Sequence, residues 1–154
     1  MKLLQQKYVM EINSKAPVIA HHEIVINGSR EKIWQILTDI NHWNLWYPNI
    51  SESKLEGLFE PNSIFRWKSG GATIISTLEE VEPQYRISWT GKAIGTQAIH
   101  VWILEPHEKG VLVKTEESFE GWLVNLLRGM MQETLDTSLQ SWLKHLKQKV
   151  EETT

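Results

Sequence analysis

The chain has 154 residues, the length of one ordinary domain that buries a hydrophobic core of its own. Its 16 basic and 19 acidic residues give a formal net charge of −3, and no run of Lys or Arg indicates a nucleic-acid or anionic-membrane footprint. The absence of cysteine excludes disulfides, thiolate metal sites and cysteine nucleophiles.

The first segment, residues 1–17, is expected to be a leader or an extra edge segment, because its polarity is mixed and it ends at Pro17. It lacks the apolar region of roughly 7 to 15 residues that a secretory signal needs, so we expect a cytoplasmic protein. No stretch approaches the roughly 20 apolar residues that span a bilayer, which argues against membrane insertion. Residues 18–152 are expected to form a single domain, because no repeat or Pro/Gly/Ser linker divides them.

The first part of this domain predicts one strand and two small helices. Residues 18–26 are rich in β-branched side chains, which favours a strand that ends at Asn27. Ser29 is a plausible N-cap, and the apolar residues that follow it recur at helical spacing, which predicts a helix over 30–38. A second turn of helix is expected to carry Trp43 and Trp46 and to stop at Pro48.

The rest of the chain predicts a meander and a long helix. Turn signals between residues 49 and 119 separate six expected strands, at 50–57, 63–68, 72–81, 84–90, 96–105 and 111–119. From Gly121 to Val150 the apolar residues recur at a period of 3.6, which predicts one continuous amphipathic helix. The expected fold class is therefore α+β, with a curved seven-stranded antiparallel sheet and the helices on one face.

A set of fold markers accompanies this order of elements: Ile26, Ile33, Trp34, Leu37, Asp39, Trp43, Trp46 and Pro48. In this pattern the chain resembles the helix-grip superfamily known as START/SRPBCC, and within it the polyketide cyclase/dehydrase-like group, over residues 18–152. The resemblance implies a sheet that wraps the C-terminal helix and leaves a cavity for lipids, hormones, polyketides or other apolar molecules. Some members use the cavity for cyclisation or dehydration, and others activate a heat-shock chaperone.

Strand alternation predicts which side chains face this cavity, because charged residues mark the outward positions. Arg66 and Lys68, Arg86 and Lys114 are assigned to solvent. Large apolar residues at the start of the helix are expected to face the sheet. The predicted ligand-binding set is Phe65, Trp67, Tyr85, Ile87, Trp89, His100, Trp102, Thr115, Glu117, Trp122, Leu126, Met130 and Met131.

His100 and Glu117 are the candidate catalytic residues. If His107 to Gly110 form the connection between their strands, the two residues lie directly opposite each other, and a tighter register makes them diagonal neighbours. A His and a Glu in an apolar wall suit general acid/base work or the orientation of a ligand. A purely structural hydrogen-bonded pair is the alternative.

No sequence motif indicates a cofactor, a metal, a phosphate loop or a serine-hydrolase elbow, and we predict none of these. The eight tryptophans either line the cavity or fill it. The preferred hypothesis is a monomer or homodimer that carries, sequesters or senses a small apolar or aromatic molecule. The alternatives are a cyclase or dehydratase that uses the His/Glu pair, and a chaperone-activator type of protein-interaction module, which predicts a large exposed apolar patch.

Overall fold

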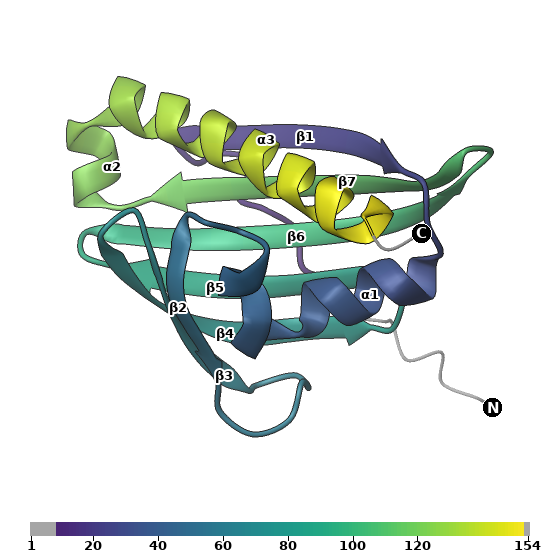
Figure 1. Ribbon diagram of the computed structural model, residues 1–154. Helices are drawn as coiled ribbons and strands as arrows, with labels where there is room; N and C mark the ends of the chain where they lie inside the picture. Colours follow the sequence, from purple (N-terminus) through teal and green to yellow (C-terminus); the bar gives the residue numbers. More distant parts are fainter. Residues whose placement is uncertain (1–8, 153–154) are drawn as a thin grey trace, which may run out of the picture.

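The computed structural model describes residues 9–152 and shows seven strands, three α-helices and one 3-10 helix, η1 (Figure 1). Residues 1–8 of the expected leader lie outside the described part. The elements in chain order are β1 Val18–Ile26, α1 Arg30–Thr38, η1 Ile40–Leu45, β2 Ile50–Leu55, β3 Ile64–Ser69, β4 Ala72–Glu82, β5 Arg86–Ala93, β6 Thr96–His107, β7 Gly110–Glu120, α2 Trp122–Leu126 and α3 Arg128–Glu151.

The strands form one antiparallel sheet in the order β1-β7-β6-β5-β4-β3-β2. Each strand from β2 to β7 pairs with its neighbour in the chain, because the connections between them are too short for any other arrangement. Helix α3 crosses the concave face of this sheet (Figure 1). The predicted helix-grip architecture is therefore confirmed.

The predicted single long helix is wrong at its beginning. Leu127 leaves helical geometry, with φ −117° and ψ 37°, and separates α2 from the 24-residue α3. Helix α2 is held instead by the turn between β5 and β6, where the Leu123 amide donates to the Gly95 carbonyl at 3.1 Å. The apolar period continues across the break, so the sequence pattern gave no sign of it.

The prediction that Tyr85 lies in a strand is also wrong, because β5 begins one residue after it, at Arg86. Gln84 has a positive φ of 67°, and the Tyr85 amide donates to the Glu82 carbonyl to close a turn. The Tyr85 side chain is 47% exposed, and the Arg30 guanidinium lies over its ring at 4.4 Å. Tyr85 therefore does not face the inner side of the sheet.

Residues 9–16 cross the outer, convex side of the sheet. The Met10 amide donates to Glu80 at 3.0 Å, and Arg86 donates to the Met10 carbonyl. The Asn13 amide donates to Ser118 Oγ at 3.0 Å. These contacts cover an ion pair between Arg86 and Glu80, whose side chains are almost fully buried although they point away from α3.

Candidate functional site

The inner side of the sheet carries most of the residues that strand alternation assigned to it. The side chains that are buried on this face as predicted are Phe65, Trp67, Ile87, Trp89, His100, Trp102, Thr115 and Glu117. Their neighbours in the sequence alternate to the outer side, because successive side chains of a strand point to opposite faces. The predicted orientation is confirmed for this set.

Aromatic rings fill the deep part of the grip. Trp43 of η1 lies 5.6 Å from Phe65 and 5.7 Å from Trp89, measured between ring centroids. Trp142 of α3 lies 5.0 Å from Trp43 and 5.6 Å from Trp102. Three of these four pairs are edge-to-face and the Trp43–Trp89 pair is tilted. Aromatic pairs at these distances stabilise a core beyond the area they bury. Of the two alternatives for the tryptophans, filling holds for this deep part, where η1 and α3 supply the central rings.

The helical residues of the predicted set are mostly not on the inner face. Trp122, Leu126 and Met130 are exposed, and Met131 is partly buried against a small core cluster that contains Leu135. Trp122 and Leu126 lie in α2, which the break at Leu127 separates from α3, and Met130 lies in the first turn of α3. The prediction that Trp122, Leu126 and Met130 face the inner side is wrong.

His100, Thr115 and Glu117 form a polar cluster on this otherwise apolar face. The β6–β7 register places His100 directly opposite Glu117, which confirms one of the two predicted arrangements. His100 Nε2 is hydrogen-bonded to Thr115 Oγ1 at 2.7 Å, and His100 Nδ1 lies 3.4 Å from Glu117 Oε1. Within the described part of the chain, His100 Nδ1 and Trp102 Nε1 are buried without a hydrogen-bond partner. The cluster thus contains buried polar atoms whose hydrogen bonding is incomplete.

Burial makes this pair neutral. It lowers the pKa of His100 to about 3 and raises the pKa of Glu117 to about 8, because desolvation disfavours the charged form of each group. Trp89 and Trp102 lie beside the imidazole, with ring centroids at 4.8 and 5.4 Å. The Nδ1 to Oε1 distance would allow an ion pair, but both groups are uncharged near neutral pH and the contact is between a carboxylic acid and a neutral imidazole.

The inner face is fully buried around His100 and only partly buried toward the β5–β6 turn, where Phe119 packs against a second core cluster that includes Val124 of α2. Along β6, Trp102 and His100 are fully buried and Ala98 is only partly buried, and along β7 the same change occurs from Thr115 to Phe119. Inner-face residues of both strands are less buried toward the β5–β6 turn, the end of the sheet at which α2 lies (Figure 1). We call this end, defined by Ala98 and Phe119, the open end. Glu117 stands at its boundary with a side chain that is 12% exposed.

Tyr47 and Asn49 add a second polar group that sequence reasoning did not select. The Tyr47 hydroxyl donates to the Ser138 carbonyl of α3 at 3.3 Å and accepts from Asn49 Nδ2 at 3.1 Å. Burial raises the pKa of Tyr47, and the charge of an ionised Glu117 acts in the same direction. The only feature of the sequence that could have pointed to Tyr47 was its position directly before Pro48.

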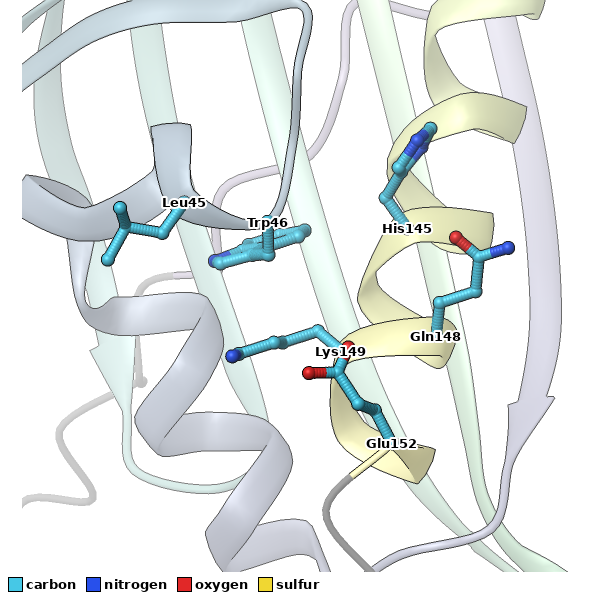
Figure 2. A pocket seen from close by; sticks show the side chains of 6 residues that line it. All are labelled: Leu45, Trp46, His145, Gln148, Lys149 and Glu152. Carbon is cyan, nitrogen blue, oxygen red and sulfur yellow. The ribbon is translucent and has the colours of Figure 1, made fainter.

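Two surface pockets flank the C-terminal half of α3, away from the polar cluster. One, of about 520 Å³, is lined by Val25, Asn27, Lys109 and Lys147. The other, of about 160 Å³, lies between η1 and α3 and is shown in Figure 2, where the Lys149 side chain extends beside Trp46. Neither pocket is lined by the aromatic residues of the inner face. Among the described residues, no group of three or more His, Asp or Glu side chains is placed to hold a metal ion.

Comparison with known proteins places these observations in a family. The family described as polyketide cyclase / dehydrase and lipid transport matches residues 17–151. No curated protein matches the sequence.

Solved structures share the fold at low sequence identity. A hypothetical protein from Helicobacter pylori has a TM-score of 0.80 and 21% identity, covering 94% of this chain and 98% of its own. A START superfamily protein from Mycobacterium smegmatis has a TM-score of 0.76 and 18% identity, with coverages of 88% and 99%. The Zhui aromatase/cyclase from Streptomyces sp. R1128 has a TM-score of 0.76 and 12% identity, with coverages of 86% and 93%. At these identities the likeness shows the fold alone.

Proposed function

The chain belongs to the polyketide cyclase / dehydrase and lipid transport family, and from this premise we propose that it binds a small, uncharged, mostly apolar molecule at the open end of the inner face. The ligand lies between sheet and helix, with its polar end toward His100 and Glu117. In this proposal the protein carries, sequesters or senses the ligand.

The observation that carries the proposal is the polar cluster itself. A buried His and a buried Glu are costly in an apolar core, because each loses its hydration and His100 Nδ1 has no hydrogen-bond partner in return. Glu117 is also the member of the cluster that reaches the open end. A hydroxyl or carbonyl group of a ligand would satisfy these polar atoms.

The neutral state of the pair defines the kind of ligand. A protonated Glu117 donates a hydrogen bond, and a neutral imidazole accepts or donates one, so the cluster suits an uncharged polar group. A ligand carboxylate would be buried beside groups that carry no compensating positive charge, which is strongly unfavourable. Of the residues that the sequence suggested for ligand binding, the proposal keeps His100 and Glu117 next to the ligand, whereas the buried rings, Trp89 among them, form the packed end wall.

A direct test is to fill the open end. The Ala98→Trp variant places an indole on the partly open inner face, and Gln97→Trp places the same indole on the outer face one residue away. We expect titration with the neutral fluorophore N-phenyl-1-naphthylamine to show saturable binding to the wild type and to Gln97→Trp. Ala98→Trp should weaken binding by at least about tenfold. The smaller Ala98→Leu variant and circular dichroism check that the loss is not one of folding.

Equal binding by wild type and Ala98→Trp would overturn this location. Native mass spectrometry of the freshly purified protein gives a second, independent result, because a retained ligand appears as a mass increment that Ala98→Trp should lose. A wild type that binds neither the fluorophore nor a co-purified molecule would overturn the binding function as a whole.

A second candidate function is a cyclase or dehydratase activity, which the geometry of the pair favours. The 3.4 Å separation of His100 Nδ1 and Glu117 Oε1 joins a protonated acid to a neutral base, the two states that proton transfer requires. In that case Glu117→Gln abolishes turnover of the molecule identified by mass spectrometry and leaves its binding nearly intact. Unchanged turnover would exclude the pair as the catalytic group.

A further inference from the structure

Four large apolar side chains are exposed at the end of the molecule where α2 lies. Ile94 in the β5–β6 turn is 83% exposed, Trp122 and Leu126 of α2 are 65% and 71% exposed, and Met130 in the first turn of α3 is 58% exposed. We call them the apical residues. None of them belongs to either core cluster, so core packing does not account for them. Burying such side chains against a partner removes apolar surface from contact with water, which is favourable.

The backbone holds these side chains in one place. Gly95 lies so close to α2 that an added Cβ would come within 2.7 Å of the Trp122 ring, which brings Ile94 beside Trp122. The Leu127 amide donates to the Leu123 carbonyl and the Met131 amide to the Leu127 carbonyl, so hydrogen bonds continue across the break between α2 and α3. The β5–β6 turn, α2 and the start of α3, which carry the apical residues, therefore lie at one end of the molecule (Figure 1).

The charge of this end differs from that of the whole chain. Residues 91–98 contain Lys92, residues 121–132 contain Arg128, and neither segment contains Asp or Glu, although the chain has a net charge of −3. Both basic residues are exposed. Glu120, which precedes the second segment, accepts a hydrogen bond from Asn13 on the outer side of the sheet. Glu133, which is exposed in α3 three residues after Met130, follows the second segment, so two exposed basic residues and one acidic residue accompany the apical residues.

We propose that this end of the protein docks on the surface of a lipid bilayer that contains anionic lipids. A Trp, two aliphatic side chains and a Met with flanking basic residues are the composition that binds in the interfacial region of a membrane. The contact is peripheral, because no helix in the described part of the chain is long and apolar enough to cross a membrane. Docking does not depend on the proposed ligand site. If both are present, the open end faces the bilayer and an apolar ligand passes between them without crossing water.

The test is co-sedimentation of the full chain with vesicles of phosphatidylcholine, alone or mixed with phosphatidylglycerol. We expect binding to the mixed vesicles that is about 25-fold stronger than to phosphatidylcholine alone, since each of the two basic residues contributes about fivefold at an anionic surface. The double variant Lys92→Gln/Arg128→Gln should remove this difference.

Leu126→Ser should weaken binding to the mixed vesicles by at least about fivefold. Leu58→Ser is the matched control, because Leu58 is 72% exposed in the β2–β3 connection and is not an apical residue. Equal effects of the two substitutions, or no co-sedimentation of the wild type, would overturn the proposal. A third result would also overturn it. If the wild type does not bind vesicles but forms a concentration-dependent dimer in analytical ultracentrifugation, and Leu126→Ser disperses this dimer, the surface binds a second copy of the chain.

Discussion

Replacing Glu117 by Gln tests the central claim about the site, that its acid is uncharged. Glutamine has the same shape and keeps a neutral polar group on the inner face, but it does not titrate. The pKa of Glu117 is raised from 4.5 to about 8 in the folded protein, because burial removes water from the carboxyl group. Between these values the folded protein keeps a proton that the unfolded chain has released.

The sign and size of the effect follow from this difference. Because the pKa is raised in the folded state, the contribution of Glu117 to stability is complete below about pH 4.5 and is lost as the pH rises through about 8. Each pH unit in this window changes the free energy of unfolding by about 1.4 kcal/mol. From about pH 5 to about pH 8, the free energy of unfolding of the wild type should therefore fall by about 4 kcal/mol relative to that of Glu117→Gln.

The assay is urea denaturation of both proteins at the two pH values, followed by tryptophan fluorescence. Glu116→Gln is the control, because Glu116 lies one residue away on the outer face, where it contacts His21 and is partly exposed. We expect this control to follow the wild type within about 1 kcal/mol. If the difference in the free energy of unfolding between wild type and Glu117→Gln is the same at both pH values, Glu117 is ionised in the folded protein and the neutral cluster does not exist.

Other substitutions test the packing around the site, each by urea denaturation. Trp43→Ala should cost about 4 kcal/mol, because it removes the central ring of the deep part; a loss below about 1 kcal/mol would contradict this. Arg86→Ala leaves Glu80 buried without its partner and should cost about 3 kcal/mol, whereas Arg66→Ala breaks an exposed pair and should cost less than about 1 kcal/mol. Gly95→Ala, at φ +64° and against α2, should cost about 1–2 kcal/mol; full stability would show that α2 is not held by this turn.

The sheet and the register of its polar pair were predictable because strand physics is local. The connections from β2 to β7 are short, so neighbours in sequence pair with each other, and a two-residue periodicity then assigns each side chain to a face. Charged residues such as Lys114 fixed the outer side. The β6–β7 connection left two registers open in the sequence, both with His100 and Glu117 as neighbours, and the structure has the one that places them directly opposite each other.

The exposed apical residues were not predictable, because apolar periodicity measures only which residues share a helix face and not where a helix begins to pack. Trp122 and Leu126 continue the stripe of α3 in sequence, but the break at Leu127 and the attachment to Gly95 depend on contacts between distant segments. Tyr85 failed for a related reason, since a single positive φ at Gln84 moved the start of its strand.

The aromatic packing and the neutral pair are parts of one arrangement. The rings of Trp89 and Trp102 cover the imidazole of His100, so little water is left to solvate a charge there, and the neutral states of His100 and Glu117 are favoured. An apolar ligand at the open end would deepen this desolvation without opposing it. A carboxylate would require one of the two groups to become charged, which the surrounding rings disfavour. In the proposed function, the tryptophans that fill the deep part would therefore also select for an uncharged ligand at its edge.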